Sequence, residues 1–524
     1  MLDTYTKTAV PVSDYAIIVN PDDNVAVVKN ETSEGLVLTL PSGDTVVVNG
    51  VVPPGHRFAT REILSGEFVR QYGQPIGTSL GIETGEWVTH DNMSDDVPVV
   101  RNLPDDLHTP APDYFEAGEI ETFMGFRRAD GRVGTRNYVL IVPTSMCASH
   151  EAMQISMMAE FLHYSREKFP NVDGVVAIPH NKGCGCQDGS NLDVMMRTLA
   201  NYADHPNVGG VILIDLGCEK TNLTFVEKYL TNREKPIQKP VFKIGIQDVG
   251  GTQSAIEIGL KEVERMLPEV NECVRKEFPA SELVLGVKCG SSDGFSGISA
   301  NPSLGYCSDL LVKSGGTVLL TEVPEFCGAE HILANRAKDS VTGRKIYALV
   351  DWYKEYASKF GGVLGQNPST GNKAGGLLNI TIKSLGAIVK AGTTRIEDCV
   401  EYAETPKLRG INLMQGPGYD QESTPGLVAA GATVVVFTTG NGTTIGNAIA
   451  PVIKLASNNR IFEKMSQDLD ISAGNVIEGT ESISQVGTRL FEHVLHVASG
   501  DIQTKAEILK HREFQFWAEQ TVSL

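Results

Sequence analysis

The feature that most constrains the fold is a repeated alternation of short apolar runs with longer amphipathic stretches, beginning near residue 136. A first series of runs reads NYVLIVPTS, GVVAIPHN, GVILIDLG and PVFKIGIQ, and a second reads ELVLGVKCG, GTVLLTEV, GINLMQGPG and TVVVFTTG. Strands that are apolar on both faces and are joined by helices belong to parallel sheets covered on both sides. The sequence therefore predicts an α/β fold with two parallel-sheet units, residues 121–278 and 279–524, the second of them Rossmann-like.

The first 120 residues show a different pattern. Residues 1–100 contain short β-branched runs (AIIV, NVAVV, LVLTL, DTVVV) separated by turn residues, which predicts a small all-β domain. Residues 101–120 are rich in proline and acidic residues without periodicity, which is typical of an extended linker. A chain of 524 residues also exceeds the roughly 250–300 residues that one core supports, so several domains are expected.

Charge and hydropathy narrow the possible partners. The formal charge of −19 disfavours a nucleic acid or an anionic membrane as partner, but a local Lys or Arg group can still bind a small anion. No apolar run approaches a membrane helix, and the N-terminus lacks the layout of a signal peptide. We therefore expect a cytoplasmic protein whose nine cysteines are thiols.

Four cysteines directly follow apolar strands. In open parallel sheets, ligands bind beyond the carboxyl ends of the strands, so these thiols are candidate metal ligands. The alternative for each one is a small buried packing residue. The four are Cys147, Cys184, Cys218 and Cys289.

Three polar, glycine-rich segments provide further candidates: 288–305, 366–376 and 438–447. Backbone NH groups and short oxygen side chains after a strand suit an oxyanion or a hard metal, which makes Asp293 a fifth candidate ligand. Candidate catalytic groups are His56, His180 and Lys373, any of which could take a proton. The candidate substrate contacts are Arg57, Ser292, Asn301, Asn372 and Asn441.

Several long motifs together resemble one family. They are GFRRADGRVGTRNYVLIVPTSMC, HNKGCGCQ, DLGCEK, KCGSSDGFSGISANPSLGYCSDLLV, NPSTGNKAGGL, KSLGAIVKAGT and TTGNGTTIGNAIAPVIKLASN. In this order they resemble the altronate and galactarate dehydratases, and PPGH around His56 resembles the small β-clip domain of that family. The resemblance implies Fe²⁺-dependent dehydration of a hexonate or hexarate, and a homodimer.

Two departures affect the expected substrate. Members of the family commonly read CGGSD and TTGRGTPFGNP, where this chain reads CGSSD (289–293) and TTGNGTTIGNA (438–448). Asn441 thus replaces an Arg that could contact a carboxylate. The sequence leaves altronate, galactarate and related acids open as substrates.

The expected chemistry is proton removal next to a carboxylate followed by loss of the neighbouring hydroxyl, giving a 2-keto-3-deoxy acid. A divalent ion would stabilise the enediolate charge; besides Fe²⁺, an iron–sulfur cluster on three strand-end thiols or Mn²⁺ or Mg²⁺ is possible. We expect the β domain to close over the site and to deliver His56. The alternatives are a lyase acting on another substituted 2-hydroxy acid, such as a sulfonated one, and a non-catalytic sugar-acid binding protein.

Overall fold

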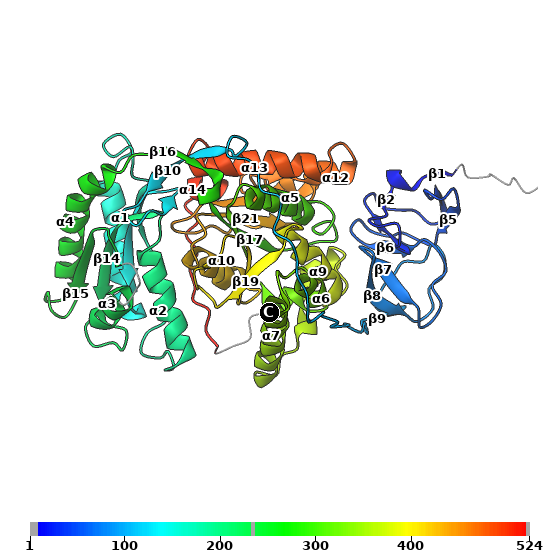
Figure 1. Cartoon of the computed structure of the whole chain (residues 1–524), viewed down its shortest axis with the longest axis horizontal. Coiled ribbons are helices and arrows are strands. Elements are labelled where there is room, and N and C mark those ends of the chain that lie inside the picture. The colour runs from blue at the N-terminus through cyan, green and yellow to red at the C-terminus, as the bar shows by residue number, and fades with distance from the viewer. Residues whose placement is uncertain (1–8, 232–235, 520–524) are drawn as a thin grey trace, which may run out of the picture.

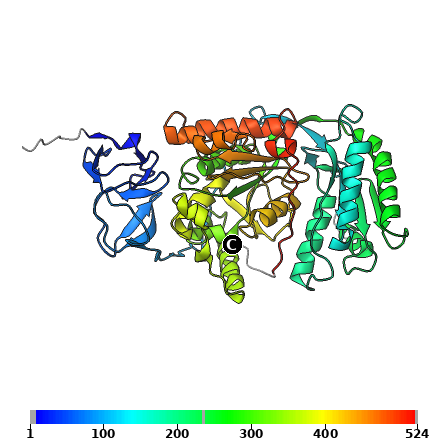
Figure 2. The same cartoon turned by 180° about the vertical axis from the view of Figure 1, so that it is seen from behind.

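The computed structural model describes residues 9–231 and 236–519, and these residues form three parts in a row (Figure 1). The C-terminal α/β domain lies in the middle, with the N-terminal β domain on one side and the second α/β unit on the other. Figure 2 shows the same order from behind. Small sheets with mainly antiparallel pairing come first along the chain and the two larger parallel sheets come after them, so the predicted fold class is confirmed.

The N-terminal domain consists of three small sheets with strand orders β1-β4-β5, β2-β3-β6 and β7-β8-β9. In β5 (Thr45–Val48), Val46 and Val48 are buried and the residues alternating with them are exposed, so one face of this strand packs onto a core that includes Phe58. Within the described part of this domain the only helical element is the short turn η1 (Val12–Asp14). The strands are β1 (Val10–Pro11), β2 (Ala16–Ile17), β3 (Val25–Val28), β4 (Leu36–Thr39), β5 (Thr45–Val48), β6 (Arg57–Ala59), β7 (Phe68–Gln71), β8 (Gln74–Ser79) and β9 (Met93–Ser94).

The second unit is a four-stranded parallel sheet with the order β13-β12-β14-β15. Every residue of β14 is buried, because helices α1 and α4 pack on one face of the sheet and α2 packs on the other. The elements are β12 (Tyr138–Pro143), α1 (Ser149–Leu162), β13 (Gly174–Ala177), α2 (Ser190–Ala203), β14 (Val208–Asp215), α3 (Leu223–Thr231), β15 (Val241–Gly245) and α4 (Thr252–Asn271).

The C-terminal domain is a seven-stranded parallel sheet with the order β19-β20-β18-β17-β21-β22-β23. The chain starts at β17, adds strands on one side, and then crosses back to add β21 on the other side. Ligands of open α/β sheets bind at such a switch point, beyond the carboxyl ends of the strands. The strands are β17 (Val284–Gly290), β18 (Thr317–Leu320), β19 (Ile396–Val400), β20 (Gly410–Met414), β21 (Val434–Thr439), β22 (Val452–Ala456) and β23 (Ile471–Ser472).

Helices cover both faces of this sheet. In Figure 1 the long helix α13 lies along one face, beside α5, and α10 lies on the other. The helices are α5 (Ala300–Lys313), α6 (Glu330–Asn335), α7 (Ser340–Lys359), α8 (Thr370–Ala374), α9 (Ile380–Ile388), α10 (Asp420–Ala429), α11 (Asn459–Lys464), α12 (Gly474–Glu478), α13 (Ile483–Ser499) and α14 (Lys505–Ile508).

The segment predicted as a linker runs along the C-terminal domain. Arg101 pairs with Asp351 at 2.7 Å and with the buried Glu330 at 3.0 Å, and the Phe115 amide donates to the Lys313 carbonyl. These contacts hold the segment in place, so it is not a free tether. The chain then enters a small sheet made of β10 (Thr122–Arg127), β11 (Val133–Gly134) and β16 (Lys276–Pro279).

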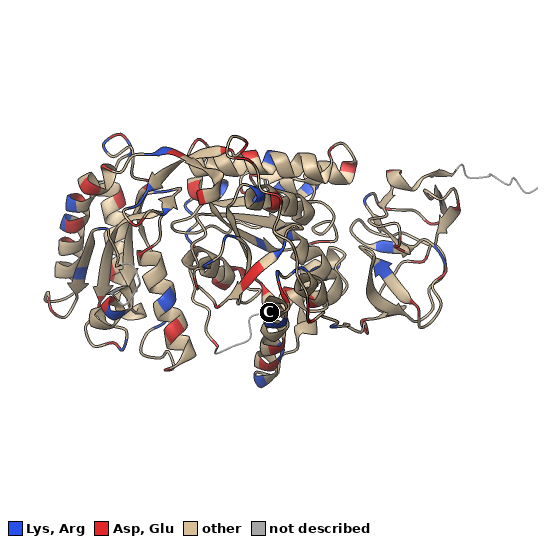
Figure 3. Ribbon diagram, viewed as in Figure 1, with Lys and Arg blue, Asp and Glu red and all other residues tan. Residues whose placement is uncertain are grey.

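Acidic and basic residues alternate along the outer helices, as Figure 3 shows for α4 and α7. Among the described residues, no helix is both long enough and apolar enough to cross a membrane.

Candidate active site at the carboxyl ends of β17 and β18

The two central strands end in unusual backbone conformations. Ser291 comes directly after β17 with a φ of 52°, and Glu322 lies just beyond β18 with a φ of 75°. Left-handed conformations cost a non-glycine residue on the order of 1–3 kcal/mol and persist only where the surroundings hold them. The Cys289 amide donates to a Glu322 carboxylate oxygen at 3.1 Å, so the ends of the two strands meet at one point.

A buried ionic cluster occupies that point. Lys390 Nζ lies 2.7 Å from Cys289 Sγ and 2.9 Å from a Glu322 carboxylate oxygen. Lys288 Nζ pairs with Glu322 and, at 2.9 Å, with Asp420. The side chains of Lys288, Glu322 and Lys390 are fully buried. Ions removed from water in this way require partners on every side, and this cluster supplies them.

Glu325, in the short helical turn η4 (Val323–Phe326), is a further buried member of the cluster. It pairs with Lys383 at 2.9 Å, and the Cys289 thiol donates to it at 3.2 Å. Burial alone would raise the pKa of Glu325, but Lys383, Lys390 and Lys288 lower it to about 2. Burial and the two carboxylates raise the pKa of the Cys289 thiol to about 12. At neutral pH the cluster therefore holds a neutral Cys289 thiol and an ionised Glu325 carboxylate beside the lysines.

A cavity of about 220 Å³ opens onto this cluster. Cys289, Glu325 and Lys383 line its inner wall, and Asn372 and Asp420 line it from neighbouring loops. The Asp420 side chain is 30% exposed, whereas its partner Lys288 is fully buried. The cavity thus presents one ammonium group, carboxylates and amides to a small polar molecule.

Cys289, Glu322 and Glu325 form a possible metal-binding group, because one ligand atom from each lies within 4.8 Å of the others. A thiolate with two carboxylates is a donor set that suits a borderline divalent ion such as Fe²⁺, so the residues fit such an ion by their chemistry. Lys390 and Lys288 contact the same atoms. An ion at this position would have to displace at least the Lys390 ammonium group from Cys289.

Several residues predicted from sequence surround this site. Asn372 caps α8 and donates to the Ser292 carbonyl at 2.8 Å, and Asn441 donates to the Ser291 carbonyl at 3.2 Å. Asn301 is buried and donates to the Gly386 carbonyl. These amides hold the loops around the cavity, and of the residues predicted to contact substrate only Asn372 lines the cavity.

The Asp293 carboxylate is bound by protein donors. It accepts hydrogen bonds from Ser457 at 2.9 Å, from Asn458 at 3.0 Å and from Ser296 at 2.8 Å. It lies outside the possible metal-binding group. Its contacts join the loop after β17 to the loop after β22.

The N-terminal domain docks on the same region through its Pro-Pro-Gly turn. His56 Nε2 lies 3.2 Å from the Ala374 carbonyl, and the buried Arg57 guanidinium donates to the Gly376 carbonyl. The Gly294 amide donates to the Gly375 carbonyl beside them. His56 and Arg57 thus bind the backbone of the 374–376 loop, while Lys373 in the same loop is exposed.

The remaining predicted residues lie in the second unit. Cys147, Cys184 and Cys218 are exposed at the carboxyl edge of its sheet. His180 is buried there, with Nε2 donating to the Pro143 carbonyl at 2.9 Å and its ring against Phe516. The structure therefore divides the predicted ligands between two sheets, and only Cys289 and Asp293 are in the C-terminal one.

Sequence reasoning missed most of the charged cluster. The signals were present, since TEVPEF places two acidic residues directly after an apolar strand and KSLGAIVKAG places two lysines seven residues apart. They were not recognised because buried ion pairs join distant segments that only the fold brings together. The missed residues are Lys288, Glu322, Glu325, Lys383, Lys390 and Asp420.

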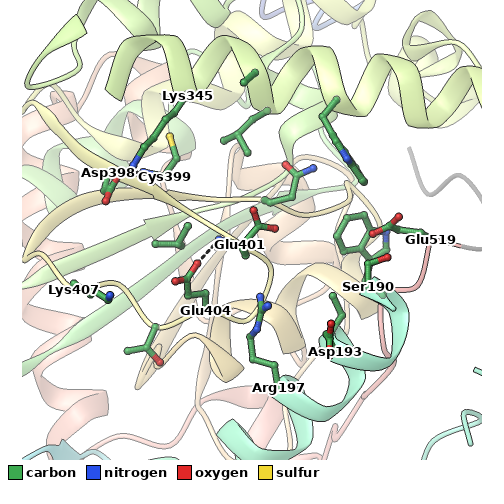
Figure 4. A pocket seen from close by; sticks show the side chains of 18 residues that line it. Ser190, Asp193, Arg197, Lys345, Asp398, Cys399, Glu401, Glu404, Lys407 and Glu519 are labelled. Atoms are coloured by element: carbon green, nitrogen blue, oxygen red, sulfur yellow. Dashed lines mark hydrogen bonds and ion pairs between the residues drawn. The ribbon is translucent and has the colours of Figure 1, made fainter. Parts of the chain in front are cut away.

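A larger cavity, of about 790 Å³, lies between α2 and α7 (Figure 4). Two of its three cationic groups are engaged within the protein: Lys345 pairs with Asp398 at 2.7 Å, and Arg197 donates to the Tyr402 carbonyl. No group of metal-ligand residues was found there within the described ranges. The larger volume of this cavity therefore does not identify it as the reactive site. The charged side chains that converge on the smaller cavity favour that one.

A charged cavity at the switch point of a parallel sheet is where an α/β protein binds a small polar ligand. The comparisons with known proteins give the family of this chain. The description "D-galactarate/Altronate dehydratase, C-terminal" matches residues 280–522, and "D-galactarate dehydratase/Altronate hydrolase, second domain" matches 125–271. The description "Altronate/galactarate dehydratase SAF domain" matches residues 14–96.

Three relatives show how much of the chain is shared. The altronate dehydratase of Bacillus subtilis is 35% identical over 495 residues, which cover 93% of this chain and 95% of that protein. The galactarate dehydratase (L-threo-forming) of Escherichia coli is 37% identical over 503 residues, 94% of each chain. The (2R)-sulfolactate sulfo-lyase subunit beta of Chromohalobacter salexigens is 32% identical over 396 residues, 75% of this chain and 96% of that subunit. The chain belongs to the altronate and galactarate dehydratase family and is a hydro-lyase.

Proposed function

We propose that this enzyme dehydrates a sugar acid of the altronate or galactarate type to a 2-keto-3-deoxy acid. The observation that carries the proposal is the match to two dehydratases over more than nine tenths of each chain. The cavity at the ends of β17 and β18 supports it, because an ammonium group and a carboxylate face a space suited to a small polar anion.

We assign the two roles that the cavity residues suit. Lys383 would hold the substrate carboxylate, since a charge-assisted hydrogen bond to an ammonium group both orients an anion and lowers the cost of further negative charge. Asp420 would take the proton from the carbon next to that carboxylate, because its carboxylate group reaches the cavity and is held at 2.9 Å by Lys288. The hydroxyl of the following carbon leaves with a proton as water, and the enol converts to the keto acid.

We further propose that the activity depends on Fe²⁺, with Cys289, Glu322 and Glu325 as the residues that would hold it. A bound divalent ion would neutralise negative charge developing on the substrate carboxylate. Exhaustive dialysis against a chelator should abolish turnover, and anaerobic Fe²⁺ with reductant should restore it more fully than Mn²⁺ or Mg²⁺. Full turnover in excess chelator would refute metal dependence.

Two variants test the assigned roles. Lys383→Met should raise KM by about 10- to 100-fold, the value of one charged hydrogen bond, and Lys383→Arg should recover part of the loss. Asp420→Asn should lower kcat by at least ~10²-fold with little change in KM. Lys359→Met, at an exposed lysine on α7, is the matched control. Equal losses of kcat in the Lys383 and Asp420 variants, with altered circular dichroism, would indicate a structural role for both.

A second candidate is a lyase acting on a sulfonated 2-hydroxy acid, which the sulfo-lyase relative favours. That match covers three quarters of this chain, whereas the dehydratases match nearly all of it, so we place it second. An assay of hexonates, hexarates and sulfolactate decides the matter: 2-keto acid without sulfite supports the dehydratase, and sulfite release supports the alternative.

We also propose, from the family resemblance, a homodimer that works in the cytoplasm. Size-exclusion chromatography with light scattering tests the dimer, and a fluorescent fusion observed by microscopy tests the location. A monomeric mass at micromolar concentration would contradict the first part.

A further inference from the structure

The carboxyl edge of the second sheet carries three thiols that the proposed reaction does not use. Cys184 lies beyond β13, Cys147 beyond β12 and Cys218 beyond β14, and these three strands are adjacent in the sheet. All three cysteines are free and exposed. The fold therefore gathers at one edge three side chains that are 34 to 71 residues apart in sequence.

Hydrogen bonds tie the three loops together. The Met146 amide donates to the Lys182 carbonyl at 2.6 Å, which joins the Cys147 loop to the Cys184 loop. The Lys220 amide donates to Cys184 Sγ at 3.4 Å, which joins the Cys184 loop to the Cys218 loop. The three cysteines therefore lie on loops that hydrogen bonds join into one platform.

A buried carboxylate completes this platform. Glu219, next to Cys218, accepts hydrogen bonds from Thr144 Oγ1 and Ser145 Oγ, each at 3.0 Å, and from the Gly217 amide at 2.7 Å. These bonds join the Cys218 loop to the Cys147 loop. All three pairs of loops are thus connected before any ligand binds, which lowers the ordering cost of binding one.

The three sulfur atoms are not close enough together to bind a single metal ion without moving. Thiolates bound to a single tetrahedral ion at ~2.3 Å lie about 3.8 Å apart. Among the described residues, Cys289, Glu322 and Glu325 are the only group of three possible metal ligands whose atoms all lie within 4.8 Å of one another. At least two of the sulfur atoms of Cys147, Cys184 and Cys218 are therefore further apart than 4.8 Å. A polynuclear cluster accepts wider spacing, since each thiolate binds a different metal atom. The amide hydrogen bond to Cys184 Sγ is of the type that stabilises thiolates on such clusters.

We propose that Cys147, Cys184 and Cys218 bind an iron–sulfur cluster, one thiolate per iron, with a further iron open to a small ligand. Each thiol loses its proton on binding. The nearby Cys186 is buried, whereas the three proposed ligands are exposed. The site lies on a different sheet from the Cys289 group, which makes the two metal proposals independent.

The test is anaerobic reconstitution of the full-length protein with ferrous iron and sulfide, followed by desalting. We expect about four iron and four sulfide per chain and the broad visible absorbance of a cluster. Cys147→Ser, Cys184→Ser and Cys218→Ser should each lower bound iron and sulfide by at least fivefold. Cys273→Ser, at a partly exposed cysteine outside the edge, should bind as the wild type does.

Two further measurements keep the proposal falsifiable. In the wild type, the cluster should protect these three thiols from iodoacetamide, as peptide mass spectrometry reports, even if a variant fails to fold. Cys289→Ser should keep the cluster while losing dehydratase activity, which separates this proposal from the proposed function. No sulfide retained by the wild type, or tight binding of one Zn²⁺ per chain with no cluster, would overturn the proposal.

Discussion

The two parallel sheets place cysteines at equivalent positions but in opposite surroundings. At the carboxyl edge of the C-terminal sheet, Cys289 is buried among lysines and carboxylates, and burial raises its pKa to about 12. At the same edge of the second sheet, Cys147, Cys184 and Cys218 are exposed. Topology thus sets where reactive side chains gather, while burial and local charge decide what they can do there.

The difference arises from the loops at the carboxyl ends of the two sets of strands. The turns that follow β17 and β18 are covered by α9, η4 and the docked N-terminal domain. Because this cover excludes water, the charged side chains in these turns pair with one another. After β12, β13 and β14 the three thiols are exposed to solvent, so they need no charged partner from the protein. A closed, charge-balanced edge and an open, thiol-bearing one should therefore respond differently to alkylation, substitution and pH.

The largest expected difference is in thiol reactivity. In metal-free native protein, iodoacetamide should modify Cys147, Cys184 and Cys218 readily. Cys289 should react at least ~10⁴-fold more slowly, because its modification requires opening of a core region and loss of its thiol proton. Peptide mass spectrometry over time measures both rates, with the urea-unfolded protein as control. Comparable alkylation rates for Cys289 and Cys147 in the native protein would show that the two sheet edges do not differ in thiol reactivity.

The next effect is on stability. Lys390→Met removes one of the two lysines that balance the fully buried Glu322, and we expect a loss of about 3–5 kcal/mol in the free energy of unfolding. The double variant Lys390→Met with Glu322→Gln removes both charges and should recover part of that loss. Urea unfolding at pH 7 gives the values. A single variant as stable as the wild type would show that the ion pair contributes little.

A smaller loss is expected at Asp293, whose carboxylate joins the loops after β17 and β22. Asp293→Ala should cost about 2–3 kcal/mol, since several charge-assisted hydrogen bonds disappear from a buried position, and it should lower turnover by at least ~10²-fold as the loops shift. Asp339→Ala, which removes the N-cap of α7, should cost about 1 kcal/mol and leave turnover unchanged. Normal turnover in the Asp293 variant would show that the loop after β17 has only a structural role.

The sequence was sufficient to predict the α/β class and the all-β N-terminal part, because apolar periodicity is a local signal, and it placed Cys289 at the end of an apolar strand, where the structure has it. Lys390 could not be assigned in this way. Its role depends on burial beside Glu322 and Cys289, 68 and 101 residues away. Arg57, predicted to contact substrate, instead binds the Gly376 carbonyl, and only the docking of two domains could reveal that contact.

The smallest effect is expected for substitution of His180, which the sequence suggests as a catalytic base. His180 lies at the carboxyl edge of the second sheet, so its substitution tests whether that edge takes part in the reaction. Its Nε2 donates to the Pro143 carbonyl and its Nδ1 accepts from the Lys182 amide, so both ring nitrogens are occupied when the ring is neutral. Burial lowers its pKa to about 4. We therefore expect His180→Gln to keep kcat within about threefold at pH 7 and to cost about 1 kcal/mol, the value of one hydrogen bond.

The pH dependence of stability checks the same claim independently. An unfolded histidine titrates near pH 6.5, so between about pH 4 and 6.5 the unfolded chain binds more protons than the folded one, and stability rises with pH. This contribution is complete above pH 6.5 and is lost as the pH falls toward 4. The Gln variant should show a flatter rise over that range than the wild type. A fall in kcat of a hundredfold or more at pH 7 in a fully folded variant would instead show that His180 acts in the reaction. The carboxyl edge of the second sheet would then share in the chemistry that we place at the ends of β17 and β18.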